Sequence, residues 1–357
     1  MSKNLIFRAG KKALPRIKSE GLCPENVKIV AGAAGGPKWL ILSHLDRIIF
    51  SSWFKMRTGP LFIIGSSAGA WRFGAVSQKD PITAIERLQT AYISQAYTSK
   101  PTPEAVTLEG NRILNTFLDD TGIREILDHP YIRLNLLAVR CRGPVASEKR
   151  IPLTFGLAIA ALCNMMHRSF LKFFFERVLF YDPRQIPPFF DMDEFPIQQI
   201  PLDRHNMRHA LLASGSIPLV MSGVRDIPGT SGGIYRDGGV TDYHLDIPFL
   251  KKEDDGIVLF PHYTNRIIPG WFDKKLIWRK PNPSNMDNVL LVSPSREFIS
   301  TLPRHSIPDR TDFRLFQGRD RERIAYWNAA VKKSESLGEA FLETVHSGKI
   351  RELVKPM

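Results

Sequence analysis

The sequence predicts an α/β fold built around a mainly parallel β-sheet. Two units near the N-terminus, at 27–50 and 61–78, each pass from a short apolar run through small residues into a helical pattern. Consecutive strand-to-helix units of this kind place their strands side by side and parallel. Further strand patterns follow after residue 230, so the 357 residues predict a single domain, 1–357.

In the first unit, the run VKIVAG from Val27 predicts a strand, and a glycine cluster separates it from an amphipathic helix. In the second, the run LFIIG at 61–65 predicts a buried strand that leads into the helix SSAGAWRFGAVSQ. Residues 80–127 then show a helical pattern with breaks at 99–103 and 119–122.

The run IRLNLLAV from Ile132 predicts another core strand. The segment 143–201 interrupts the strand and helix alternation, and its richness in Phe and Pro predicts a cap inserted into a core of about 27–260. Within that core, a helix NMRHALLAS and strands GGIYRDGG and GIVLF resume the pattern, and a further strand, NVLLV, follows it. Residues 295–357 predict a mainly helical extension, with a charged amphipathic helix or helix pair at 320–346.

The net charge of +13, from 49 Lys and Arg against 36 Asp and Glu, favours a polyanionic partner. The basic residues are scattered and form no nucleic-acid-binding motif, so we expect no nucleic acid and favour an anionic membrane surface. Cys23, Cys141 and Cys163 suggest neither a disulfide framework nor a thiolate zinc site. With no recognisable secretory signal, we expect a cytoplasmic protein with at most peripheral membrane contact.

A G-x-S-x-G motif, Gly65-Ser66-Ser67-Ala68-Gly69, stands directly between a predicted strand and a predicted helix. That is the position of a nucleophile elbow, in which a sharp turn exposes the central serine. Glycines two residues to either side allow the strand and the helix to pack closely around a strained turn. Ser67 is therefore a candidate nucleophile, and the alternative is a tight turn with an inert serine.

The motif AGGPK at 34–38 opens the preceding helix. Glycine N–H groups at a helix N-terminus can hold an anion. A phosphate-binding P-loop needs Ser or Thr after its lysine, but here Trp39 follows Lys38. An oxyanion hole needs only N–H donors, which Gly35 and Gly36 can supply.

Asp237 is followed by Gly238 and Gly239 at the end of a predicted strand. Two glycines let the chain turn sharply while a neighbouring group comes close to the aspartate. Asp-Gly is also common in surface hairpins, so a turn without function is the alternative.

In this order the motifs resemble the patatin-like phospholipase family, whose pattern is a glycine-rich loop with a basic residue, a G-x-S-x-G elbow and a later Asp-Gly-Gly or Asp-Gly-Ala. Here these stand at 35–38, Ser67 and Asp237. A fourth block of the family, alanine-serine followed by small residues and isoleucine-proline, stands at 213–218 as ASGSIP. The resemblance covers roughly 27–248.

The chain departs from the family pattern at several positions. Ala34 stands where a third loop glycine is usual, and Trp39 replaces the glycine after the basic residue. Pro37 has no N–H to donate, and no asparagine-proline pair follows Asp237 closely. These changes bear on substrate preference more than on chemistry.

The resemblance implies a three-layer α/β/α patatin-like fold with a helical cap, and hydrolysis of phospholipid or lysophospholipid esters without a metal or cofactor. It implies that Asp237 takes the proton of Ser67, which attacks the ester carbonyl and forms an acyl-enzyme without a catalytic histidine. The N–H groups of Gly35, Gly36 and Ala68 would hold the oxyanion, where one donor typically contributes about 3 kcal/mol.

The sequence also predicts that residues 151–175 form an interfacial lipid-access cap. The first part, 151–166, has no charge, contains Pro152 and Gly156, and is shorter than the roughly 20 residues of a spanning helix. The second part mixes aromatics with cations, a composition suited to the depth of lipid head groups. A helix that simply covers the sheet is the alternative.

Two other functions remain open at this point. A histidine-dependent α/β-hydrolase would use His262 or His305 as its base, and a membrane-associated scaffold would have no activity. Metal sites are disfavoured: His205 and His209 lack the glutamate of a zincin between them. The calcium-loop pattern that begins at 191–193 is broken by a phenylalanine and a proline.

Overall fold

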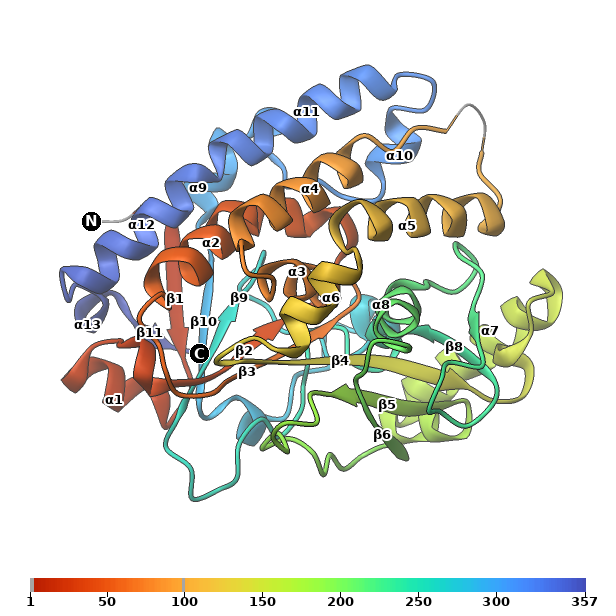
Figure 1. Cartoon of the computed structure of the whole chain (residues 1–357), viewed down its shortest axis with the longest axis horizontal. Helices are drawn as coiled ribbons and strands as arrows, with labels where there is room; N and C mark the ends of the chain where they lie inside the picture. Colours follow the sequence, from red (N-terminus) through yellow and green to blue (C-terminus); the bar gives the residue numbers. More distant parts are fainter. Residues whose placement is uncertain (1–2, 98–99) are drawn as a thin grey trace.

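The computed structural model describes residues 3–97 and 100–357, in which helices and a central sheet form a three-layer α/β/α fold (Figure 1). The predicted fold class is confirmed. The strands are β1 Leu5–Ala9, β2 Val27–Gly32, β3 Leu61–Ser66, β4 Ile132–Cys141, β5 Phe175–Tyr181, β6 Ile197–Pro201, β7 Val224–Arg225, β8 Ile234–Asp237, β9 Ile257–Pro261, β10 Val289–Pro294 and β11 Lys355–Pro356. The helices are α1 Ala13–Glu20, α2 Ser43–Ile48, α3 Ala68–Val76, α4 Pro81–Ile93, α5 Pro103–Phe117, α6 Asp120–Leu127, α7 Arg150–Met166, α8 Met207–Gly215, α9 Arg296–Thr301, α10 Asp312–Leu315, α11 Asp320–Lys333, α12 Glu335–His346 and α13 Ile350–Leu353.

The centre of the sheet is parallel. Its order is β11-β1-β10-β9-β2-β3-β4-β5-β6, and the five strands from β10 to β4 run parallel to one another. Strands buried on both faces need nearly continuous apolar sequence, which is what the runs VKIVAG and LFIIG supply. In Figure 1, α2, α4, α11 and α12 lie above the sheet and α1 lies below it.

Strand β4 pairs with two strands along one of its edges. The paired residues of β3 end at Ser66, opposite Leu137, and those of β8 end at Asp237, opposite Ala138. Because β3 runs parallel to β4 and β8 runs antiparallel to it, the carboxyl ends of β3 and β8 meet head-on. This junction positions the candidate site.

The segment 143–201 is only partly a cap. Strands β5 and β6 lie inside it and extend the sheet beyond β4, so that only 143–174 and the loop 182–196 stand outside the sheet. The aromatic and β-branched residues of FERVLFY suit a strand, and composition alone does not distinguish them from the residues of a cap. Strand β1, which pairs antiparallel with β10, likewise lies outside the predicted core of 27–260.

The two breaks predicted at 99–103 and 119–122 coincide with helix starts. The side chains of Thr102 and Asp119 accept hydrogen bonds from backbone N–H groups in the first turns of α5 and α6, at 3.2 and 2.7 Å. Such caps satisfy N–H groups that have no partner within the helix. Ser99, the first residue of one break, lies outside the described residues.

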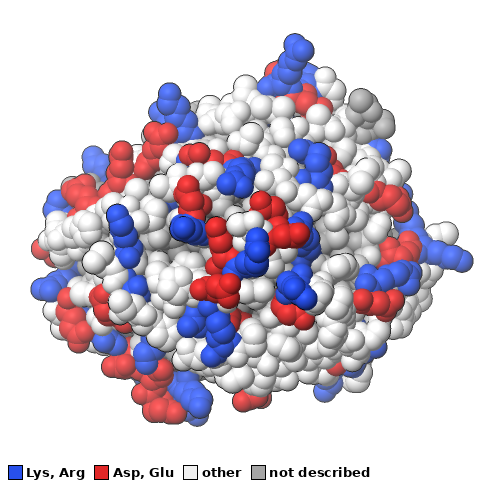
Figure 2. Space-filling view, in the orientation of Figure 1, with Lys and Arg blue, Asp and Glu red and all other residues white. Residues whose placement is uncertain are grey.

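Charge is mixed over the face drawn in Figure 2, where acidic and basic side chains alternate and form no single basic tract. Within 3–97 and 100–357, no helix combines the length and the apolar character that crossing a bilayer requires. The three cysteines are free thiols.

Candidate active site

The elbow predicted at Ser67 lies where β3 ends and α3 begins. Ser67 has a φ of 54° and a ψ of −123°, a conformation that residues other than glycine rarely adopt. Its N–H donates to Ser214 Oγ at 2.9 Å, and Ser214 Oγ donates to the Leu137 carbonyl at 2.7 Å. The strained turn is therefore held by hydrogen bonds to α8 and β4.

Gly65 and Gly69 leave no room for side chains. A Cβ atom on Gly65 would lie 2.5 Å from the Ala70 nitrogen, and one on Gly69 would lie 2.0 Å from the Gly32 carbonyl oxygen. Strands β2 and β3 and helix α3 therefore meet at backbone contact, which is the physical reason for both glycines of the motif.

Asp237 ends β8, and its carboxylate faces the elbow. Ser67 Oγ donates to Asp237 Oδ2 at 2.6 Å, and the Gly239 N–H donates to Oδ1 at 2.7 Å. Ser67 is 5% exposed and Asp237 is 6% exposed. Burial raises the pKa of Asp237 to about 6, although the hydrogen bond from Ser67 opposes the rise. The serine thus contacts a fixed carboxylate whose pKa lies near neutrality.

The loop with Gly35 and Gly36 borders the same cavity as Ser67. Tyr263 OH donates to the Ala34 carbonyl at 2.7 Å, which anchors the loop. In the described chain, the backbone N–H groups of Gly35, Gly36 and Ala68 donate to no protein acceptor. These three N–H groups are available to a ligand beside Ser67.

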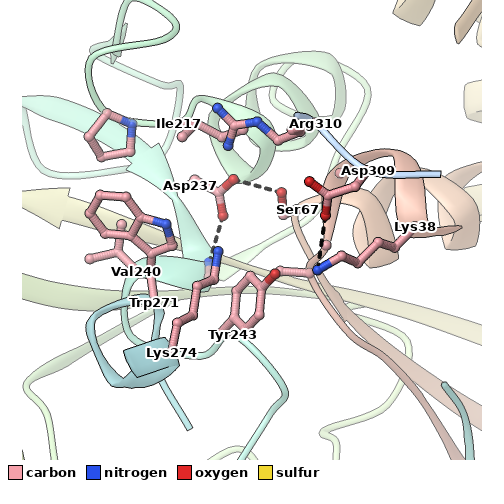
Figure 3. A pocket seen from close by; sticks show the side chains of 15 residues that line it. Lys38, Ser67, Ile217, Asp237, Val240, Tyr243, Trp271, Lys274, Asp309 and Arg310 are labelled. Carbon is pink, nitrogen blue, oxygen red and sulfur yellow. Dashed lines mark hydrogen bonds and ion pairs between the residues drawn. The ribbon is translucent and has the colours of Figure 1, made fainter. Parts of the chain in front are cut away.

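Two cavities meet at Ser67. One, of about 170 Å³, is polar, and Figure 3 shows Lys38, Lys274 and Arg310 around it. The other, of about 540 Å³, is mainly apolar and lies between α3, α5 and the C-terminal helices. Its apolar lining includes Trp39, Trp71, Val106, Ile113, Val220, Met221 and Phe313. Ser67 and Arg310 border both cavities.

The cations of the polar cavity differ in their partners. Lys38 Nζ forms an ion pair with Asp309 Oδ2 at 3.1 Å. Lys274 Nζ lies 4.0 Å from the centre of the Tyr243 ring, and neither Lys274 nor Arg310 has an ion pair within the described chain. Arg310 packs over the glycine loop, since a Cβ atom on Gly36 would lie 2.9 Å from Arg310 Cδ.

Sequence motifs did not reveal several residues of the site. Lys274, Asp309 and Arg310 lie beyond residue 248, in surroundings without a recognisable pattern. Ser214, which accepts the Ser67 N–H, belongs to the ASGSIP block. That block was the one sequence feature from which a position beside the elbow could have been predicted for Ser214.

The two histidines of the alternative mechanism lie elsewhere. His262 is fully buried, and burial lowers its pKa to about 3. His305 is exposed and contacts the Ser300 carbonyl. Neither histidine lines either cavity at Ser67. In the part of the chain that the structure describes, no cluster of three or more His, Cys, Asp or Glu side chains could hold a metal ion.

No protein-family model matches the chain, and no curated protein matches it in sequence. Among solved structures, the human GIVD cytosolic phospholipase A2 aligns with 9% identity and a TM-score of 0.42, over 96% of this chain and 63% of its own. VipD from Legionella pneumophila aligns with 12% identity and a TM-score of 0.33, over 68% of this chain and 51% of its own. The chain thus spans less than two thirds of either structure.

Proposed function

We propose that the chain is a serine acyl hydrolase that cleaves carboxylic ester bonds of phospholipids or lysophospholipids, with Ser67 as nucleophile and Asp237 as base. The observation that carries this proposal is the 2.6 Å hydrogen bond from Ser67 Oγ, at a strained elbow, to a buried carboxylate. A residue with so rare a backbone conformation persists only where its surroundings hold it there, and such strain is concentrated at functional sites.

In the proposed reaction, Asp237 accepts the Ser67 proton as Oγ attacks the ester carbonyl carbon. The negative charge moves to the carbonyl oxygen, where the N–H groups of Gly35, Gly36 and Ala68 stabilise it. The ester C–O bond then breaks, Asp237 returns the proton to the leaving alcohol, and an acyl-enzyme remains. Water attacks the acyl-enzyme, Asp237 accepts a water proton and passes it to Ser67 Oγ, and the free acid leaves.

The two cavities at Ser67 support a lipid substrate. The apolar cavity of about 540 Å³ suits an acyl chain. Binding there is favourable because it removes the apolar surface of the chain from water. The polar cavity presents Lys274 and Arg310 without acidic partners, so it suits the phosphate of a phospholipid head group. An ester bond between these two parts of a phospholipid would lie at Ser67.

A fluorophosphonate probe, which labels activated serines covalently, tests the proposal. We expect labelling of the folded chain, loss of labelling and of esterase activity in Ser67→Ala, and only reduced activity in Ser66→Ala. Ser66 is a matched control because it neighbours Ser67 but is fully buried, with a hydroxyl that contacts no partner in the described residues.

Failure of the folded protein to label would favour the inactive scaffold. Equal loss of activity in both serine variants would contradict the assignment of Ser67.

A further inference from the structure

Helix α7 leaves one apolar face uncovered. Its inner face, with Leu153, Leu157 and Ala160, is buried in a small core that includes Val139 and Phe175. The opposite face carries large apolar side chains that are at least half exposed: Ile151 84%, Phe155 62%, Leu162 58%, Met165 50% and Met166 76%. Their spacing places them along one stripe of the helix, about 25 Å long for 17 residues.

Two neighbouring segments extend this stripe. Phe173, in the turn after α7, is 65% exposed, and Ile277 and Trp278 are 72% and 63% exposed. Arg279 Nη2 donates to the Asn164 carbonyl at 2.6 Å, which ties Ile277 and Trp278 to the C-terminal end of α7. We call α7's outer face, Phe173 and 277–278 the apolar rim. It holds eight of the 15 large apolar side chains exposed in the described chain, so the exposure is concentrated there.

Exposed cations flank the apolar rim at both ends of α7. Exposed Lys149 and Arg150 lie at the start of α7, and Lys172, Lys275 and Lys280 lie beyond its other end. The ranges 149–175 and 274–280 contain no acidic residue, and the exposed Glu148 just before them is ion-paired with Arg236 at 2.7 Å. None of these five cations has an ion pair among the residues described. A second copy of the chain, docked face to face, would bring like charges together and would be repelled.

The apolar rim also adjoins the candidate site. Asn164 of α7 donates to Asp273 Oδ1 at 2.7 Å, and Asp273 belongs to the short 3₁₀ helix Trp271–Lys275. Trp271 and Lys274 of that helix line the polar cavity at Ser67 (Figure 3). A partner on the apolar rim would therefore sit close to the polar cavity.

We propose that the apolar rim is a docking surface for an anionic lipid bilayer, in which α7 lies in the plane of the interface. Exposed aromatic and aliphatic side chains insert among the acyl chains, and the flanking lysines and arginines contact anionic head groups. The inner face of α7 stays packed on the protein throughout. This inference concerns a surface and does not depend on the catalytic roles of Ser67 and Asp237.

The structure corrects the extent of the predicted lipid-facing segment. Phe175 is fully buried beneath α7 and Phe174 is half-buried, so neither is available to a membrane. Of the three consecutive phenylalanines, Phe173 alone belongs to the apolar rim.

Co-sedimentation of the full chain with vesicles tests the docking surface. We expect binding to phosphatidylcholine vesicles that contain phosphatidylserine, and about tenfold weaker binding by the double variant Phe155→Ser, Met166→Ser. A control variant, Met56→Ser with Leu108→Ser, removes comparably exposed apolar side chains, 85% and 73%, outside the apolar rim and should bind like the unaltered chain. Replacing Lys149, Arg150 and Lys172 with glutamine should weaken binding only where phosphatidylserine is present.

Unaltered vesicle binding by the Phe155, Met166 variant would overturn the proposal. The proposal would also be overturned if sedimentation velocity showed that the unaltered chain is a dimer and that this variant is a monomer. A second copy of the chain would then cover the apolar rim. Thermal unfolding of each variant shows whether the fold is retained. Fluorophosphonate labelling without vesicles tests the hydrolase separately, so failure of either idea leaves the other open.

Discussion

At the scale of single residues, the candidate chemistry depends on how Asp237 is held. A free aspartate, with a pKa near 4, is a weak base toward a hydroxyl. Burial at the end of β8 raises the pKa of Asp237 to about 6, and the Gly239 N–H fixes the orientation of the carboxylate. The carboxylate can therefore contact Ser67 directly, without an imidazole between them.

Replacing Asp237 with asparagine removes this base while preserving the shape of the side chain. The amide oxygen can still accept from the Gly239 N–H, so we expect the fold to remain. We expect kcat to fall by about 10²- to 10⁴-fold, because an amide cannot take the serine proton. Steady-state kinetics on a soluble ester measures the loss, and unchanged turnover in the folded variant would transfer the base to another group.

The pH dependence of the proposed reaction follows from the raised pKa of Asp237. The base acts in its ionised form, so we expect kcat/KM to fall as the pH drops through about 6 and to level off above it. A pH–rate profile on a soluble ester gives the midpoint. A midpoint near 4 would mean that the acting carboxylate is solvated, which conflicts with the buried position of Asp237.

At the scale of elements, the site depends on a close approach of β8 to β4. A Cβ atom on Gly238 would lie 2.3 Å from the Leu137 carbonyl oxygen, and 3.0 Å from Ser66 Oγ. The aspartate can reach the elbow only because the residue after it has no side chain. The junction of β3 and β8 thus explains the Asp-Gly pair better than a surface hairpin does.

We therefore expect Gly238→Ala to destabilise the protein by about 1–3 kcal/mol and to reduce esterase activity, because backbone must shift to admit the methyl group. Gly59→Ala is the matched control, since nothing lies within 4 Å of a Cβ atom at Gly59. Thermal unfolding of both variants provides the measurement. Equal stability of the two would contradict the close packing of β8 on β4.

At the scale of the whole molecule, the candidate site is assembled from distant parts of the chain. The proposed nucleophile, Ser67, follows β3, and the proposed base, Asp237, ends β8. The cations Lys274 and Arg310 come from the last third of the sequence. Residues 295–357, including helices α9–α13, therefore contribute to the cavities as well as covering the sheet.

Arg310 allows a test of this assembly. A lysophospholipid carries the phosphate that Arg310 is proposed to contact, and a monoacylglycerol does not. Hydrogen bonds to charged groups contribute about 1.5–3 kcal/mol. In Arg310→Gln we therefore expect kcat/KM for the lysophospholipid, divided by kcat/KM for the monoacylglycerol, to fall about 10- to 100-fold. Both substrates should carry the same acyl chain. Arg296→Gln, an exposed arginine of α9, is the control, and an unchanged ratio in Arg310→Gln would remove Arg310 from phosphate recognition.

The sequence by itself determined the local features of the protein. Apolar runs bounded by glycines predicted the central strands, because strands buried on both faces need such sequence. The small residues around Ser67 predicted a strained elbow, and the glycines after Asp237 predicted a close approach of the backbone. Both features depend on a few adjacent residues, so a local pattern is enough to predict them. The interfacial character of α7 remained open, since a buried helix and an interfacial helix share the same composition.

Only the tertiary structure decided which distant residues meet. Two strands, β5 and β6, lie in the predicted cap segment, where β5 pairs with β4 and β6 pairs with β5. The sequence did not predict this, because pairing between strands is a long-range contact without a local signal. In the same way, Ser67 and Asp237 are 170 positions apart in the sequence, and the shared edge of β4 brings Oγ within 2.6 Å of the carboxylate. Arg310 reaches the glycine loop through packing alone, and packing depends on the whole chain being folded.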